Sequence, residues 1–318
     1  MLNFGIVGMN PGNGHPYSFT AVFNGFNPDA LEQCDFPIIR QYLVQHHRNQ
    51  QFIQNARVTH VWTQDRSLSE KIAAVSRIPN VVDSLAQLAD ETDAIIFARD
   101  DIWNHFEMAR SLFRTGKPIY MDKLLCATQE ELKIWSQEIP ADYPLMTASS
   151  FRFAPIVKDA VAAVKARRPM AVHGVSPCVW IRYAPHLLDP LFEICGRDVA
   201  SVQNSGSDKH DIVTLTFADG LMAVLEVHEG ISLPMGLKLR FSAPEQAIDV
   251  PYTDPTLESY FLSIVEMMRQ FTRMVEFGEH PVSMSETLFI NRVVLSGIAS
   301  REQGGRKILL SEFLPDII

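Results

Sequence analysis

Residues 2–17 read LNFGIVGMNPGNGHPY, and they are the most informative part of the chain about its fold. A compact apolar run, 2–7, ends at Gly8, which is typical of a strand in a parallel sheet that is covered on both faces. The turn that follows is rich in Gly, Asn and Pro, and Pro16 suits the first turn of a helix. Apolar residues then recur at helical spacing over 17–26. The order of strand, glycine turn and helix is the one that opens a dinucleotide-binding fold.

Outward from this start, strand-like and helix-like patterns alternate over the first 150 residues. We expect strands at 58–63, 93–98 and 118–121, and helices at 67–76 and at 102–115, the last closed by Gly116. Such alternation predicts an α/β fold with a doubly wound parallel sheet and right-handed crossovers. Residues 27–56 contain two prolines and a polar run, do not continue the pattern, and are interpreted as an insertion.

The pattern changes after about Pro155. A helix is expected at 155–165, and Asp219-Gly220 is a strong hairpin signal between two strand-like runs. We therefore predict an α+β domain with a largely antiparallel sheet, and place the two domains at 1–123 and 124–318. The runs that predict strands are 171–175, 212–217, 221–227 and 237–241, and two long helices are expected at 258–277 and 285–303.

Composition excludes several classes of protein. The chain has 28 Lys+Arg and 37 Asp+Glu, a formal net charge of −9, which argues against binding nucleic acid or an anionic membrane surface. Its four cysteines form no CxxC pair, so neither a disulfide framework nor a metal site is expected. No apolar run approaches the ~20 residues of a membrane span, and the start lacks the basic region of a signal peptide. The expectation is a soluble, cytoplasmic protein.

The glycine turn contains the first candidate site. Backbone N–H groups at a helix N-terminus bind pyrophosphate, and glycines allow its close approach. Against the GxGxxG spacing, Gly8 keeps the first position, while Asn10 and Asn13 stand at the second and third. A tight turn without a ligand is the alternative. The candidate dinucleotide contacts here are Gly8, Asn10, Gly12, Asn13, Gly14 and His15.

A carboxylate after the second strand normally bonds the ribose hydroxyls of the cofactor, about 20 residues past the glycines. Asp65 follows the predicted strand 58–63 but lies 65 − 8 = 57 residues past Gly8, a gap that the insertion explains. Asp65 favours NAD, whereas Arg66 could meet the 2′-phosphate of NADP, so both cofactors stay open. Asp65 could equally cap the helix that begins near Ser67.

Two residues are candidates for catalysis. Lys123 follows the strand 118–121 at its carboxyl end, where ligands bind in such sheets and a lysine can donate a hydrogen bond to a substrate oxygen. The alternative is a surface lysine paired with Asp122. His186 is the best general-base candidate, and Asp189 could orient it if the segment is helical. A structural histidine is the alternative there.

Several segments resemble, in order, motifs of the Gfo/Idh/MocA family, the relatives of glucose–fructose oxidoreductase and inositol dehydrogenase. The run 115–128, TGKPIYMDKLLCAT, is similar to the family's aGKhVlvEKPlalt. The other similar segments are 93–105 (DaVviatPnxxH), 151–155 (RFxP), 186–196 (HxlDlxxxlxG), 217–220 (fxnG) and 277–300 (G.xPpvs and the final helix).

The resemblance implies a Rossmann domain, bound NAD or NADP, and hydride transfer on a sugar, polyol or related carbinol. It also implies a C-terminal sheet that forms a homodimer or homotetramer. By this resemblance Lys123 bonds the reacting oxygen and the nicotinamide side, His186 is the base, and His105 lies near the nicotinamide ribose. Asp122 stands where the family has Glu. The candidate substrate contacts are Arg152, Arg182, Tyr183 and Asp189.

The chain departs from the family pattern at two places. Asp122-Lys123-Leu124 replaces Glu-Lys-Pro, and Arg182 stands where the family commonly has Asp, which suits an acidic or phosphorylated substrate. Tyr183 could substitute as a proton donor or simply pack. The first hypothesis is therefore an NAD(P)-dependent oxidoreductase. The second is a non-redox member that binds a dinucleotide or a sugar, or uses tightly bound NAD without net redox change. A partner-binding protein on a Rossmann scaffold is the third.

Overall fold

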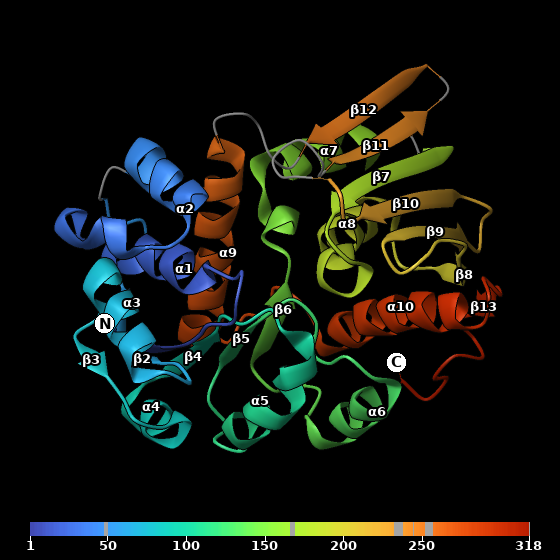
Figure 1. The fold of residues 1–318 in the computed structure, drawn as a ribbon. Coiled ribbons are helices and arrows are strands. Elements are labelled where there is room, and N and C mark those ends of the chain that lie inside the picture. Colours follow the sequence, from blue (N-terminus) through green and yellow to red (C-terminus); the bar gives the residue numbers. More distant parts are fainter. Residues whose placement is uncertain (48–49, 166–168, 232–237, 244, 252–256, 318) are drawn as a thin grey trace. The chain divides into compact units, whose positions relative to one another are not determined.

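A computed structural model describes the chain except residues 48–49, 166–168, 232–237, 244, 252–256 and 318 (Figure 1). The described chain divides into two compact units. The first unit comprises Met1–Asp122, Ile139–Thr147 and Ile264–Met284. The second unit comprises Lys123–Glu138, Ala148–Ser263 and Ser285–Ile318.

The first unit contains a six-stranded sheet in the order β3-β2-β1-β4-β5-β6. Because this order is that of the doubly wound dinucleotide-binding folds, the predicted parallel sheet is confirmed. Strands β1, β2, β3, β4 and β5 pair in parallel, and every residue of β4 and β5 is buried, which explains their continuous apolar sequences. The strands are β1 Leu2–Val7, β2 Ala56–Trp62, β3 Asn80–Val81, β4 Ala94–Phe97, β5 Ile119–Asp122 and β6 Leu145–Ala148.

Helices connect these strands as the alternating pattern predicts. The predicted helix at 102–115 is divided into a 3-10 turn and α5, and Gly116 follows with a φ of +71°. Helix α4 and strand β6 were not predicted, since both are short and lack a clear apolar period. The helices and turns are α1 His15–Asn24, α3 Arg66–Ser76, α4 Leu85–Glu91, a 3-10 turn Ile102–Asn104 and α5 His105–Phe113.

The insertion at 27–56 is more ordered than its sequence indicates. It holds a 3-10 helix Pro28–Gln33, the helix α2 Pro37–Tyr42 and a π turn Leu43–His47. A proline begins each of the first two, and the Asn27 side chain accepts a hydrogen bond from Asp29 N at 3.2 Å. The insertion contributes buried apolar side chains to the first unit, among them Ile39, Tyr42 and Leu43.

The second unit contains a seven-stranded sheet in the order β12-β11-β7-β10-β9-β8-β13. Among the described strand pairs of this sheet only β7 and β10 are parallel, so the predicted largely antiparallel α+β domain is confirmed. The hairpin at Asp219-Gly220 joins β9 and β10, and Gly220 has the positive φ of +89° that such a turn requires. The strands are β7 Ala171–Pro177, β8 Val199–Asn204, β9 His210–Phe217, β10 Met222–His228, β11 Lys238–Ala243, β12 Gln246–Pro251 and β13 Ile308–Leu309.

Strands β8, β12 and β13 were not predicted, because their apolar residues are too few for a clear alternation. The predicted strand at 237–241 appears as β11, and its first residue, Leu237, lies outside the described residues. One face of the sheet is buried: along β9 and β10 every second residue is covered. The helices are α6 Gln129–Glu138, α7 Pro155–Lys165, α8 Trp180–Cys195, α9 Glu258–Phe277, which also contributes to the first unit, and α10 Met284–Glu302.

Within the described residues, no helix has the length and apolar character needed to span a membrane.

Candidate active site

The glycine turn lies where β1 ends and α1 begins. A Cβ on Gly8 would lie 2.3 Å from Pro16 Cγ, and a Cβ on Gly14 would lie 2.3 Å from Ile39 Cδ1. These two glycines therefore let the turn pack tightly against α1 and the insertion. Gly12 has a φ of +81° and no atom within 4 Å of an added Cβ, so its backbone faces open space.

The N-terminus of α1 is suited to binding an anion. Its N-cap residue, Gly14, has no side chain, and its first turn contains no acidic residue. The Asn13 side chain accepts a hydrogen bond from the backbone N–H of His15 at 2.7 Å, which fixes the last residues of the turn. Because the positive end of the helix dipole lies here, this is the part of the turn best suited to a phosphate group.

Asn10, at the second glycine position of the motif, is buried and serves as a clamp. Its Nδ2 donates to Asp100 Oδ1 at 2.9 Å, and Asp100 N donates to Asn10 Oδ1 at 3.2 Å. The paired side chain and backbone hold the turn after β1 to the turn after β4. Sequence reasoning did not single out Asp100, although charged residues directly after a buried strand were a visible signal.

A second hydrogen-bond network surrounds Arg99, a residue that was not predicted from the sequence. Its Nη1 donates to Met9 O at 3.1 Å and to Gln64 Oε1 at 2.7 Å, and its Nε donates to Asp101 Oδ1 at 2.8 Å. Gln64 in turn donates to Met9 O at 2.8 Å. The segments after β1, β2 and β4 are therefore tied together at the carboxyl edge of the sheet.

His15 and Asp122 meet at the same edge, although 107 residues separate them. His15 Nδ1 lies 2.5 Å from Asp122 Oδ2, and the His15 ring stacks on Phe19 with centroids 4.9 Å apart. Asp122 is buried. Its partner is thus an imidazole of the glycine turn, which the sequence did not indicate.

His105 begins α5 and is completely buried. Its Nε2 donates to Arg99 O at 3.0 Å, which fixes the tautomer with the proton on Nε2. The ring also meets Phe97 edge-on, with centroids 5.2 Å apart. These contacts hold the backbone of Arg99, and a position near a nicotinamide ribose stays a prediction.

Asp65 caps helix α3, as one of its two predicted roles required. Its Oδ1 accepts from Ser67 N and from Ser67 Oγ, both at 2.8 Å, and these bonds lower the pKa of the Asp65 carboxyl. Arg66 pairs with Glu70 at 3.1 Å and with Asp83. The ribose role of Asp65 and the 2′-phosphate role of Arg66 stay predictions.

In the second unit, His186 is held by Ser149. His186 lies on α8, is 8% exposed, and its Nδ1 is 2.6 Å from Ser149 Oγ. Asp189 does not contact the His186 ring directly: its Oδ2 accepts from Ser149 N at 2.6 Å, and so it holds the residue that holds the histidine. Sequence reasoning missed Ser149 because the strand before it, β6, was not predicted.

Lys123 and Tyr183 complete this group. Lys123 Nζ lies 5.3 Å from the centre of the Tyr183 ring, within cation–π distance, and that ring meets His186 with centroids 5.1 Å apart. Lys123 is 3% exposed, so it is not a surface lysine, as one of its two interpretations required. The helix α8 brings Tyr183 and His186 to one face because they are three residues apart.

Arg152 is surrounded by carboxylates. Its Nη1 lies 2.5 Å from Glu286 Oε1 and 3.7 Å from Asp189 Oδ1, and its Nη2 pairs with Glu193. Burial, together with the negative charges of Glu286 and Glu193, raises the pKa of Asp189 to about 7 against the opposing effect of Arg152. Arg152 is therefore engaged by protein carboxylates, whereas Arg182, in the first turn of α8, is half-buried.

The predicted site residues thus form two groups. In the first unit the structure brings together the glycine turn, His15 and Asp122, while Asp65 and Arg66 serve α3. In the second unit it brings together Lys123, Tyr183, His186 and Asp189 around Ser149. Among the residues that the structure describes, no cluster of His, Cys, Asp and Glu could hold a metal ion.

Comparison with known proteins gives similarity in structure only. No family model and no curated protein sequence matches this chain. The solved structures that resemble it include scyllo-inositol dehydrogenase from Lactobacillus casei with bound NAD(H) and scyllo-inositol, with a TM-score of 0.75, 10% identity and coverage of 98% of this chain and 100% of that one.

Two further similar structures extend the range of relatives. Myo-inositol dehydrogenase from Corynebacterium glutamicum has a TM-score of 0.75 at 13% identity, covering 98% of this chain and 99% of that one. GenD2 from gentamicin A biosynthesis, in complex with NAD, has a TM-score of 0.70 at 13% identity, covering 97% of this chain and 96% of that one. At such identities the likeness establishes the fold, which this chain shares with dehydrogenases over nearly its whole length.

Proposed function

We propose that this protein is an NAD(P)-dependent oxidoreductase that moves a hydride between a nicotinamide and a carbinol of a sugar, polyol or related molecule. The observation that carries the proposal is the group in the second unit, where a buried histidine held by Ser149 lies against Tyr183, with the buried Lys123 on the same ring. A base and a cation arranged in this way suit the removal of a proton from a hydroxyl group.

The first unit offers a fitting place for the dinucleotide. The glycine turn follows β1 at the carboxyl edge of the sheet, Gly12 faces open space, and the first turn of α1 contains no acidic residue of its own. The backbone of Gly12 to Gly14 would hold the pyrophosphate, with His15 beside it. When bound, the nicotinamide would supply the hydride acceptor.

His186 is proposed as the base that accepts the hydroxyl proton. Ser149 Oγ accepts a hydrogen bond from Phe151 N at 3.1 Å, which fixes that hydroxyl in position beside His186 Nδ1. With its Nδ1–H donating to Ser149 Oγ, the imidazole would accept the hydroxyl proton at Nε2. Ser149 is then a positioning residue, and Asp189 acts through it.

Lys123 is proposed to stabilise the negative charge that develops on the substrate oxygen as the proton leaves. A lysine ammonium group donates up to three hydrogen bonds, and its burial makes each of them stronger than in water. Stacking on Tyr183 keeps the side chain in place. Arg182 on the same helix would favour a substrate with an acidic group.

A polyol substrate is favoured because the similar structures include inositol dehydrogenases, one of them with scyllo-inositol bound. We also propose that the sheet of the second unit forms a homodimer or homotetramer. Its uncovered face carries alternate half-exposed residues along β9 and β10. The molar mass from light scattering would test the assembly, since a monomer at micromolar concentration contradicts it.

A non-redox binding protein is the second candidate, and one observation favours it. The carboxylate of Asp100, in the segment after β4, is buried and lies 2.9 Å from Asn10 Nδ2 of the turn that would receive the pyrophosphate. A fixed negative charge there opposes a second one. A protein with this turn could bind a sugar, or bind a dinucleotide without exchanging electrons.

The test is a titration of nucleotide-free protein with NADH and separately with NADPH, followed by fluorescence and calorimetry, and then a polyol and sugar panel read at 340 nm. Saturable binding with reduction of the oxidised nucleotide supports the dehydrogenase. Binding without reduction across the panel supports the second candidate, and no binding contradicts the proposed cofactor.

Arg66→Gln is the matched variant. It should lower affinity for NADPH and leave NADH unchanged if Arg66 meets a 2′-phosphate.

A further inference from the structure

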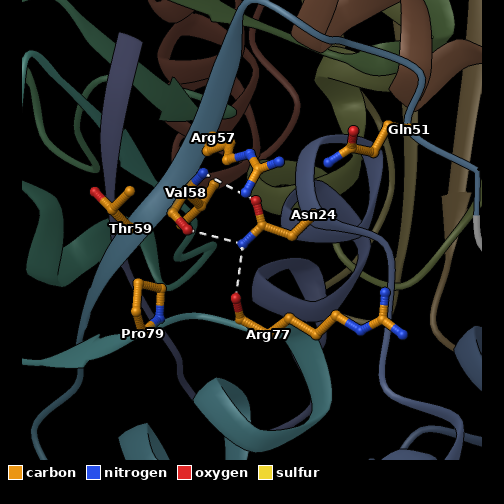
Figure 2. A pocket seen from close by; sticks show the side chains of 7 residues that line it. All are labelled: Asn24, Gln51, Arg57, Val58, Thr59, Arg77 and Pro79. Atoms are coloured by element: carbon orange, nitrogen blue, oxygen red, sulfur yellow. Dashed lines mark hydrogen bonds between the residues drawn. The ribbon is translucent and has the colours of Figure 1, made fainter. Parts of the chain in front are cut away.

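A cavity of about 390 Å³ lies in the first unit, away from the glycine turn (Figure 2). It is lined by the last residue of α1, by the segment after α3 and by the first half of β2. Because these residues lead from helices into the starts of strands, the cavity lies at the amino edge of the parallel sheet, opposite the edge where the glycine turn follows β1. The seven lining residues are Asn24, Gln51, Arg57, Val58, Thr59, Arg77 and Pro79.

The floor of this cavity is fixed by Asn24. Its Nδ2 donates to Val58 O at 2.8 Å and to Arg77 O at 3.3 Å, and its Oδ1 accepts from Val58 N at 3.2 Å. Figure 2 shows the Asn24 amide between these two backbone segments. A rigid floor of this kind holds the surrounding side chains in a constant position.

Arg77 stands in an unusual backbone conformation at this floor. It ends α3 with φ +54° and ψ +42°, the left-handed region that residues other than glycine rarely adopt. The Asn24 bond to its carbonyl helps to hold it there. Strain of this type is commonly found where a side chain serves a function, and here it places an arginine on the wall of the cavity.

The charges of the cavity are unbalanced. None of its seven lining residues is acidic, although the whole chain has a net charge of −9. Arg57 and Arg77 are exposed, and neither guanidinium has a carboxylate or carbonyl partner among the described residues. The other arginines of the first unit that do have a carboxylate within 4 Å are Arg40, Arg66, Arg99, Arg269 and Arg273.

The wall of the cavity also contains a neutral hydrogen-bond donor, the amide of Gln51. Figure 2 shows the Gln51 amide and the Arg57 guanidinium pointing toward one another, with the Arg77 side chain extending past Asn24. Two guanidinium groups and an amide are the donors that suit the oxygens of a phosphate, which arginine binds in pairs of hydrogen bonds. The volume is within the range of small-molecule sites.

We propose that this cavity binds a small molecule through a phosphate group, using Arg57 and Arg77 to neutralise its charge and Gln51 to accept or donate the remaining hydrogen bond. The site lies at the opposite edge of the sheet from the glycine turn. It therefore does not depend on whether the protein binds a dinucleotide.

The test is isothermal titration of the full chain with inorganic phosphate, with glucose 6-phosphate and with glucose. The double variant Arg57→Gln, Arg77→Gln removes both charges, and the single variants keep the test valid if the double variant does not fold. Glutamine is chosen because it strains the left-handed backbone at position 77 as much as arginine does. The matched control is Arg114→Gln, an exposed arginine elsewhere in the first unit.

We expect saturable binding of the two phosphates and none of glucose. Affinity should fall at least about tenfold in the Gln variants and stay unchanged in Arg114→Gln. Tighter binding of glucose 6-phosphate than of phosphate identifies an organic phosphate as the ligand, and equal binding identifies the ion itself. The proposal is overturned if neither phosphate binds, if the Gln variants bind as the wild type does, or if Arg114→Gln loses as much affinity.

Discussion

Two buried arginines, Arg99 of the first unit and Arg152 of the second, have similar exposure but different surroundings. Their side chains are 8% and 9% exposed. Arg99 has one carboxylate partner, Asp101, and donates its other hydrogen bonds to neutral oxygens. Arg152 has three carboxylate partners, so its cluster contains more negative than positive charge, even though Arg197 also pairs with one of them.

Because their charge balance differs, Arg99 and Arg152 have different effects on the carboxylates around them. Arg99 and Asp101 form a pair of opposite charges. Burial raises the pKa of Asp101, but its hydrogen bonds from Arg99 and Asn104 outweigh this effect and lower the pKa. The network around Arg99 therefore only positions backbone. Around Arg152 the surplus of carboxylates and complete burial raise the pKa of Asp189 to about 7. The second cluster can therefore gain or lose a proton near neutral pH, while the first cannot.

The largest effect is expected from a substitution of Lys123, which tests whether residues of the second unit take part in catalysis. Lys123→Met keeps an unbranched side chain of nearly the same length and removes its charge, so turnover should fall by about 10²–10⁴-fold because the developing oxyanion loses its cation. Nucleotide affinity and the melting temperature should change little. Lys133→Met, at an exposed position of α6, is the control. Full activity of Lys123→Met would contradict the proposed role.

The next effect compares the two arginines directly. Arg152→Met leaves Asp189 and Glu286, which are largely buried, and the more exposed Glu193 without their shared cation, and should reduce the free energy of unfolding by about 3–5 kcal/mol. Arg99→Met leaves one carboxylate, Asp101, which keeps a hydrogen bond from Asn104 Nδ2 at 2.7 Å, so its loss should be smaller. Urea unfolding at pH 7, followed by tryptophan fluorescence, measures both. Equal losses would show that charge balance does not distinguish the clusters.

A third effect concerns pH. The pKa of Asp189 in the folded protein, about 7, lies above its ordinary value in the unfolded chain, so between the two values the folded state binds more protons. This carboxyl should therefore make the protein less stable as pH rises from about 4 to 7, with a slope of at most about 1.4 kcal/mol per pH unit.

Asp189→Asn, which imitates the protonated form, should remove that contribution. The free energy of unfolding of both proteins, measured from pH 4 to 8, tests it. If the two curves are parallel over that range, Asp189 does not titrate as the burial implies.

The smallest effect lies at the carboxyl edge of the first unit. Asp65→Ala removes the cap of α3 and should lower the melting temperature slightly, because Ser67 N loses its acceptor. Asp65 has a lowered pKa, so its stabilising effect should be present above its ordinary pKa and disappear as pH falls, opposite in sign to that of Asp189. Asp65→Asn, which also caps, should be closer to the wild type by differential scanning calorimetry.

Local features were readable from the sequence because their causes lie within a few residues. The strand 2–7, the hairpin at Asp219-Gly220 and the helix 258–277 follow from apolar period and turn chemistry alone. The cap role of Asp65 was among the predictions for the same reason, since its acceptor and donor are two residues apart. The candidate site was readable as residue types: Lys123 and His186 were selected, and the structure brings both to the Tyr183 ring.

The alternation of elements, and with it the class of both sheets, could be predicted from the sequence. The partners of the buried polar groups became known only from the folded chain: Asn10 with Asp100, and Ser149 with His186. The tertiary structure also brought Arg57 and Arg77 to one cavity at the amino edge, where neither has a carboxylate within 4 Å among the residues that the structure describes. The physical reason is range. Apolar periodicity acts between neighbours along the chain, whereas a buried hydrogen bond or ion pair depends on which strand ends meet, and that is fixed only when the whole sheet has assembled.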